Sequence, residues 1–353
     1  QLNTNTRYLY DQLNKYSASL LSYFPKPLNK VFFVNSGSAA SDLAIRLARN
    51  FTGKNRVAAV EHGYHGNTQS IIEISHYKFG GKGGKGASKN VLCLPIPGTY
   101  RSDFNNETAG LSFAKDAIQK INNSEEKIAA FIAEPVVGCG GQVPLAKGYL
   151  KEVYSAIRKQ GGVCISDEVQ TGFGRLGDFF WGFEAQEVVP EIVILGKPMG
   201  NGHPMGAVIT TDEIADAFNN GMEFFSSFGG NPVSCAIGQA VLEVIEEEQL
   251  QKNAKTVGDY YIEKLTELQQ KYESIGDVRG SGLFVGFEFV KDRTTLEPDT
   301  ELAQKVKNEL RNQYILVGID GPYDNVIKSK PPLCFSKENV DEVVFALTNI
   351  LKK

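Results

Sequence analysis

The sequence predicts an α/β protein with a large domain on a mostly parallel, seven-stranded sheet and a smaller C-terminal α+β domain. Two observations support this fold class. Seven short apolar runs alternate with segments of helical periodicity up to residue 210, a pattern typical of a parallel sheet that helices cover on both faces. Several of these runs stop at a polar or glycine-rich turn, and ligands collect beyond the strand ends of such sheets.

The first elements are a helix and then a strand–turn–helix unit. Apolar residues at helical spacing predict an amphipathic helix over 8–22. The apolar run 31–34 predicts a strand, which stops at the turn Asn35-Ser36-Gly37-Ser38, and a second helix is expected over 39–50. The same order then repeats. Further strands are expected over 56–60, 88–94, 129–133, 163–166, 192–195 and 206–210, and further helices over 112–122 and 147–160.

The last part of the chain predicts a different organisation. After Asn231-Pro232 a long helical stretch is expected to run to about residue 272, and alternation at Phe284, Gly286 and Glu288 then predicts a strand. No linker rich in proline or serine is present, so the two domains are expected to pack tightly. We expect an N-terminal helical segment over 1–27, a large domain over 28–250 and a small domain over 251–353.

Composition excludes several classes of protein. The 353 residues include 37 basic and 41 acidic side chains, so the net charge of −4 argues against nucleic-acid and anionic-membrane partners. Hydrophobic residues make up 42% and charged residues 22%, which is ordinary for a globular protein. The apolar runs are too short to cross a bilayer. Five scattered cysteines favour a cytoplasmic protein without a disulfide framework.

Three groups at strand ends point to one chemistry. Lys197 lies between Gly196 and Pro198, and partial burial there would favour the neutral amine that makes a Schiff base. Asp167 is placed to pair with a protonated ring nitrogen, and the Ser36-Gly37-Ser38 turn offers N–H groups and hydroxyls to a phosphate. Each group alone has an ordinary explanation as a surface lysine, a turn residue or a helix cap. Together they are what pyridoxal phosphate requires.

Motifs along nearly the whole chain resemble the class III pyridoxal-phosphate enzymes, the subgroup II aminotransferases of fold type I. The most specific stretch is Asp-Glu-Val-Gln-Thr-Gly-Phe-Gly-Arg at 167–175. The family's phosphate turn usually has a glutamate where this chain has Ala39. The other matching stretches are 35–40 (Asn-Ser-Gly-Ser-Ala-Ala), 63–66 (Gly-Tyr-His-Gly), 134–135 (Glu-Pro), 196–198 (Gly-Lys-Pro) and 227–232 (Ser-Phe-Gly-Gly-Asn-Pro).

The resemblance implies a role for each matching residue. Lys197 would form the Schiff base and move the proton, and Asp167 would hold the proton of the pyridinium ring. Ser227 stands where a threonine is usual, in a loop that crosses to a second subunit, so the resemblance implies a homodimer with the active site at its interface. The remaining implied cofactor contacts are Gly37 and Ser38 at the phosphate, Tyr64 and Val169 on the two ring faces, Gln170 at the ring hydroxyl, and His65 and Glu134 in support.

Within the family, the chain is most similar to the branch of ethanolamine-phosphate and 5-phosphohydroxy-lysine phospho-lyases. The matching stretches are 97–101, 201–204, 228–237, 278–286, 320–322 and 328–335. The implied reaction eliminates phosphate from a phosphorylated amine such as ethanolamine phosphate, and it gives an aldehyde, ammonia and phosphate. Lys328 replaces an arginine that binds a substrate carboxylate in many members, and a lysine is a point charge and not a fork. Lys328 and Arg101 are the candidates for phosphate contact.

Two alternatives stay open. One is an amine or ω-amino-acid aminotransferase on the same fold. The other is a catalytically weak domain that serves assembly or regulation, against which the intact Lys197 and Asp167 argue. The stretch 172–177 matches G-x-G-x-x-G, but no helical pattern follows it, so no dinucleotide site is expected. The four histidines complete no tetrahedral ligand set, so no metal is expected. The resemblance also implies that a further segment of the family's chain precedes Gln1.

Overall fold

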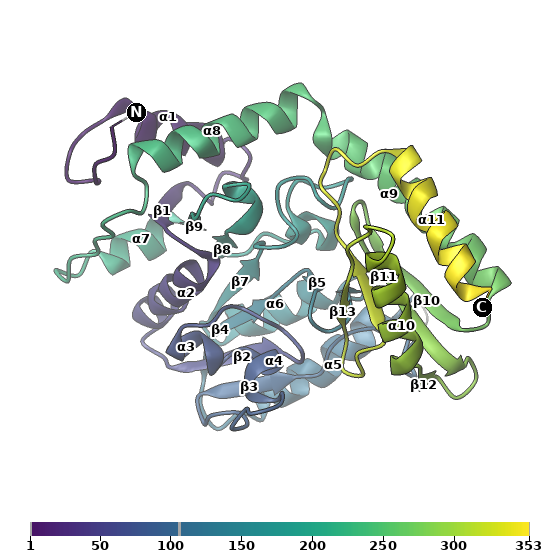
Figure 1. The fold of residues 1–353 in the computed structure, drawn as a ribbon. Coiled ribbons are helices and arrows are strands. Elements are labelled where there is room, and N and C mark those ends of the chain that lie inside the picture. The colour runs from purple at the N-terminus through teal and green to yellow at the C-terminus, as the bar shows by residue number, and fades with distance from the viewer. Residues whose placement is uncertain (1, 105–106, 353) are drawn as a thin grey trace.

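A seven-stranded sheet forms the centre of the larger part of the molecule and confirms the mostly parallel sheet that the sequence predicts (Figure 1). The computed structural model describes residues 2–104 and 107–352. Strand β9 runs antiparallel to both of its neighbours, and the pairings from β8 across to β3 are parallel. In spatial order the strands are β1 (Lys30–Val34), β9 (Gly206–Thr210), β8 (Ile192–Leu195), β7 (Val163–Asp167), β4 (Ile128–Ala133), β2 (Arg56–Val60) and β3 (Val91–Leu94).

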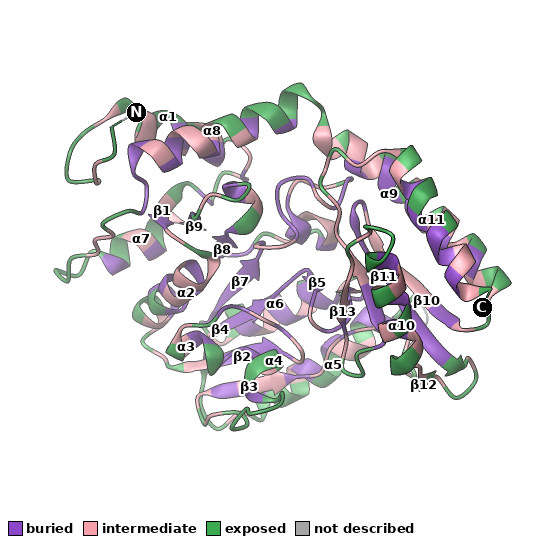
Figure 2. Ribbon diagram, in the orientation of Figure 1, coloured by how far each residue is buried: buried purple, intermediate pink, exposed green. Residues whose placement is uncertain are grey.

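Helices cover both faces of this sheet, which explains why its strands read as continuous apolar runs. Alternate residues of one strand enter different hydrophobic clusters: Val57 and Ala59 pack with helix α2, whereas Ala58 and Val60 pack with α5 and α6. Figure 2 shows the five inner strands of the sheet as buried, whereas the edge strands β1 and β3 are partly exposed. Helices α2 (Gly37–Thr52), α3 (Gln69–Ile72) and α7 (Asp212–Phe218) lie on one face, and α1 (Asp11–Leu21), α5 (Ala109–Asn122), α6 (Tyr149–Lys159) and α8 (Pro232–Glu247) lie on the other.

A second, antiparallel sheet of five strands belongs to the C-terminal part. One face of this sheet packs against three helices, and Figure 1 shows α9 and α11 lying side by side. The boundary near residue 250 stays a prediction. The elements are α9 (Leu250–Lys271), β10 (Ile275–Ser281), β11 (Phe284–Asp292), β12 (Glu297–Pro298), α10 (Thr300–Arg311), β13 (Gly318–Asp320), β14 (Val326–Ser329) and α11 (Lys337–Leu351).

The helical stretch expected from Pro232 to about residue 272 is confirmed, and it consists of two helices. Helix α8 ends at Glu247, and Gln249 adopts a φ of 51° in the left-handed region before α9 begins. The strand expected over 88–94 begins only at Val91. The sequence did not predict the short elements α3, α4 (His76–Phe79), β5 (Val136–Val137), β6 (Val143–Pro144), and the 3-10 turns Gly182–Gln186 and Lys197–Met199. Within the described residues, we found no helix long and apolar enough to span a bilayer.

Candidate active site

The polar residues that follow five strands of the large sheet meet around one cavity of about 140 Å³, which we call the inner cavity. Its lining contains every cofactor residue that the sequence predicts except Ser227. Because these residues follow β1, β2, β4, β7 and β8, the cavity lies at the carboxyl ends of these strands, the usual place for a ligand in such sheets. The lining residues are Ser36, Gly37, Ser38, Tyr64, His65, Gly66, Glu134, Asp167, Val169, Gln170 and Lys197.

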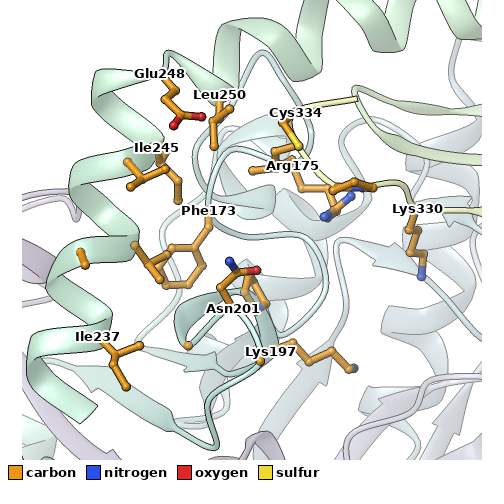
Figure 3. Close-up of a pocket in the computed structure, with 18 of the residues that line it drawn as sticks. Phe173, Arg175, Lys197, Asn201, Ile237, Ile245, Glu248, Leu250, Lys330 and Cys334 are labelled. Carbon is orange, nitrogen blue, oxygen red and sulfur yellow. The ribbon is translucent and has the colours of Figure 1, made fainter. Parts of the chain in front are cut away.

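Lys197 has a strained backbone. Its φ is 30°, in the left-handed region, which costs a residue with a side chain about 1–2 kcal/mol. A Cβ added to Gly196 would lie 3.1 Å from the Cα of Gly37, so the lysine turn packs directly on the first turn of α2. Lys197 is exposed and not half-buried as expected, and its side chain extends toward the side on which Lys330 lies (Figure 3).

Asp167 is held on both carboxylate oxygens at the end of β7. Its Oδ2 lies 2.7 Å from Nδ1 of His65, and its Oδ1 accepts the Val169 N–H at 3.1 Å. Both Asp167 and His65 are buried. The carboxylate is therefore fixed in orientation where it faces the inner cavity, as an acceptor for a ring nitrogen requires.

The first turn of α2 could hold an anion, and we call its residues Ser36, Gly37 and Ser38 the phosphate cradle. The Ser36 side chain caps the helix by accepting the Ala39 N–H at 3.1 Å. The N–H groups of Gly37 and Ser38 have no acceptor within the helix, because the first donors of a helix never do. A helix N-terminus with free N–H groups attracts phosphate.

A close approach of Gly66 closes one side of the cradle. A Cβ at Gly66 would lie 2.8 Å from the Oγ of Ser38, and the φ of Gly66 is +137°. The Ser38 hydroxyl donates to Oδ1 of Asn67 at 2.9 Å and accepts the Asn67 N–H at 3.2 Å. Only glycine fits this position without moving Ser38.

Glu134 links the turn 63–66, which carries Tyr64, to Gln170. Its Oε1 accepts the Tyr64 N–H at 3.1 Å, and its Oε2 accepts from Nε2 of Gln170 at 3.3 Å. Burial raises the pKa of Glu134, and the nearby Asp167 raises it further. The other end of the Gln170 amide accepts from Nζ of Lys330 at 2.8 Å.

Lys330 contacts Gln170 at the site but was not predicted from the sequence. The residue two positions earlier, Lys328, was considered because it replaces an arginine of the family. Side chains two apart share one face of a strand, but β14 ends at Ser329, so Lys330 leaves that pattern. The one feature of the sequence that could have pointed to Lys330 as a site residue is its position directly before Pro331-Pro332.

Three predicted residues lie outside the inner cavity. Ser227 is exposed in the loop between α7 and α8. Arg101 lines a separate cavity of about 920 Å³, and its Nε donates to Glu288 at 2.6 Å. Lys328 is paired with Asp320 at 3.0 Å.

The residues present fit pyridoxal phosphate, because an amine, a fixed carboxylate and an anion cradle line one cavity at the strand ends. The fold and this site define the class as a pyridoxal-phosphate-dependent enzyme of fold type I. Residues 3–351 match the family described as Aminotransferase class-III, and the chain belongs to that family. When bound, the cofactor supplies an electron sink for charge that develops on the substrate carbon.

Relatives whose names refer to two different activities match almost the whole chain. It is 49% identical to the alanine–glyoxylate aminotransferase 2-like protein of Drosophila melanogaster, over 99% of this chain and 73% of that protein. It is 41% identical to ethanolamine-phosphate phospho-lyase homolog 1 of Caenorhabditis elegans, over 98% of this chain and 78% of that protein. A solved Arthrobacter phospholyase in complex with phosphoethanolamine is 36% identical with a TM-score of 0.93, covering 100% of this chain and 84% of that one.

Proposed function

We propose that the protein is a phospho-lyase that acts on a phosphorylated amine such as ethanolamine phosphate and releases aldehyde, ammonia and phosphate. The observation that supports this most directly is the residue at position 328. Many family members have an arginine there, which binds a substrate carboxylate through two N–H groups. Here the position holds Lys328, a point charge paired with Asp320 at 3.0 Å. A substrate with an α-carboxylate therefore lacks its usual partner. Similarity to proteins named as phospho-lyases in two organisms adds support.

The chain's own residues would divide the work as follows. The amine of Lys197 removes the proton from the carbon that bears the substrate nitrogen. Asp167 accepts from the ring nitrogen of the cofactor, and the phosphate cradle holds the cofactor phosphate through the N–H groups of Gly37 and Ser38. Two further lining residues, Tyr64 and Val169, would contact the two ring faces, and Gln170 would reach the ring hydroxyl.

We also propose a homodimer with the active site at its interface. The loop between α7 and α8 carries Ser227 and the exposed apolar side chains Met222 and Phe228. Exposed apolar side chains in one loop favour a protein–protein contact there. In such a dimer this loop would bring the Ser227 hydroxyl to the phosphate cradle of the second copy. The five free thiols fit a reducing compartment, and we propose the cytoplasm.

A single incubation tests the activity. The cofactor-loaded protein is mixed with ethanolamine phosphate in the absence of any keto acid, and free phosphate and ammonia are measured together. Equimolar release is expected, with no release from the Lys197→Ala variant. Amine transfer that depends on a keto acid, without phosphate release, would support the alternative, a class III aminotransferase. The 49% identity to a protein named as an aminotransferase-like enzyme favours that alternative.

A further inference from the structure

Lys330 lies where the small domain meets the site. It directly follows β14, and its Nζ donates to Oε1 of Gln170 at 2.8 Å and lies 3.9 Å from the ring centroid of Phe284. Beside the inner cavity is a larger one of about 720 Å³, which we call the outer cavity and which Lys197 and Lys330 both line. Figure 3 shows Lys330 reaching from the small domain toward the side into which Lys197 extends.

The outer cavity carries an excess of positive charge. Three cationic side chains line it, those of Arg175, Lys197 and Lys330, whereas Glu248 is the one acidic residue of the lining within the described ranges. Nη1 of Arg175 donates to two backbone carbonyls and not to a carboxylate. A cavity with this balance attracts anions, and low-dielectric walls strengthen the effect.

Lys330 differs from the two cations that the sequence singled out. Lys328 is paired with Asp320, and Arg101 is paired with Glu288. In the part of the chain that the structure describes, no ion pair joins Lys330 to a carboxylate, and its polar partner is the amide of Gln170. Burial lowers the pKa of Lys330 to about 8, and Glu134 partly offsets the effect of burial. Much of the ammonium form therefore remains at neutral pH, and a bound anion would favour it further.

We propose that Lys330 is the residue that binds the phosphate of the substrate and stabilises it as it leaves, an inference that rests on the proposed phospho-lyase activity. Lys197 removes a proton from the carbon bearing nitrogen, and the C–H electron pair becomes the new double bond. The C–O bond then breaks, and its electron pair departs with the bridging oxygen. The departing phosphate takes up one proton, which balances the one proton that Lys197 removed. The ammonium of Lys330 compensates the charge on the leaving oxygens.

The test compares two ligands on the cofactor-loaded protein. Binding of ethanolamine phosphate and of phosphate-free ethanolamine is followed through the visible absorbance of the cofactor, in the wild type and in the Lys330→Met, Lys330→Gln and Lys330→Arg variants. We expect Lys330→Met and Lys330→Gln to weaken binding of the phosphorylated amine about 10- to 100-fold, as loss of a charged hydrogen-bond partner does. In the same two variants, binding of ethanolamine should change less than about threefold. The Lys330→Arg variant should keep most of the preference for ethanolamine phosphate over ethanolamine. Lys305→Met, an exposed charge removal on α10, is the control.

The outcomes separate this inference from the proposed function. Equal weakening of both ligands would overturn the inference, since Lys330 would then only position Gln170. A preference that survives in Lys330→Met and Lys330→Gln but is lost in Lys328→Met would overturn it in favour of Lys328. If the wild type releases no phosphate but loses its preference for the phosphorylated amine in both Lys330 variants, the lyase activity fails and the binding role of Lys330 stands. A wild type that shows no preference overturns the binding role of Lys330, and one that in addition releases no phosphate overturns both.

Discussion

Nδ1 of His65 lies 2.7 Å from Oδ2 of Asp167, and this contact joins two strand ends in the buried interior of the site. His65 follows β2 and Asp167 ends β7, so the contact spans β4, which lies between them in the sheet. Nε2 of His65 is buried and has no hydrogen-bond partner within residues 2–104 and 107–352. The carboxylate of Asp167 is therefore the hydrogen-bond partner of the His65 ring, and this contact holds the carboxylate in its orientation.

Replacing His65 should weaken cofactor binding, because His65 holds the Asp167 carboxylate in place. We expect His65→Leu to weaken cofactor binding about 10-fold or more, because a hydrogen bond to a charged group is lost and Asp167 gains freedom. Equilibrium dialysis of the cofactor measures the change. His203, which bonds to Ser234 outside the inner-cavity lining, gives the matched control His203→Gln. Equal losses in both variants would show that His65 acts only on general stability.

The strained backbone of Lys197 predicts a difference between two variants that both lack the amine. Lys197→Ala keeps a side chain at a φ of 30°, whereas Lys197→Gly does not. We expect the glycine variant to be more stable than the alanine variant by about 1 kcal/mol, the reverse of the usual order. Urea unfolding of the two cofactor-free proteins measures it. An alanine variant of equal or greater stability would show that the position carries no strain.

The glycine that closes the phosphate cradle offers another matched pair. Gly66→Ala would place a Cβ 2.8 Å from Ser38 Oγ, whereas Gly53→Ala meets nothing within 4 Å, and both positions have a positive φ. Each variant should lose about 1 kcal/mol of stability from the backbone alone. Only Gly66→Ala should also weaken cofactor binding, by about 10-fold or more if one phosphate contact is lost. Cofactor titration of both variants decides whether the cradle geometry matters.

The half-buried amine of Lys330 predicts a pH dependence of stability. Its folded pKa of about 8 lies below the ordinary value of 10.5, so the folded protein binds fewer protons than the unfolded one between these values. Stability contributed by this group therefore rises from pH 8 to 10.5 and is lost as pH falls through 8. Relative to Lys330→Met, the cofactor-free wild type should gain on the order of 1–3 kcal/mol across that window. The measurement is the unfolding free energy of both proteins at several pH values. If the difference between them does not change with pH, Lys330 has its ordinary pKa.

Much of the large domain and of the candidate cofactor site could be predicted from the sequence. Buried parallel strands appear as apolar runs, and the polar residues of a ligand site directly follow these runs. The turns after 31–34 and 163–166 and the lysine after 192–195 are read directly from the chain. Contacts between the domains could not be found this way. Arg101 and Glu288 are 187 residues apart, and only the packed fold pairs them. The left-handed Gln249 that separates α8 from α9 has neither glycine nor proline to mark it.

The exposed loop between α7 and α8 predicts how the subunits meet. Phe228 is 62% exposed beside Ser227, and Phe345 on α11 is 69% exposed. If the loop forms the interface, Phe228→Glu should produce monomers in sedimentation, because a buried carboxylate in an apolar contact is strongly unfavourable. Phe345→Glu should leave the dimer intact. The monomer should also bind cofactor more weakly, about 10-fold, since the Ser227 hydroxyl no longer reaches a neighbouring cradle. A Phe228→Glu protein that stays dimeric with full cofactor affinity would place the interface elsewhere.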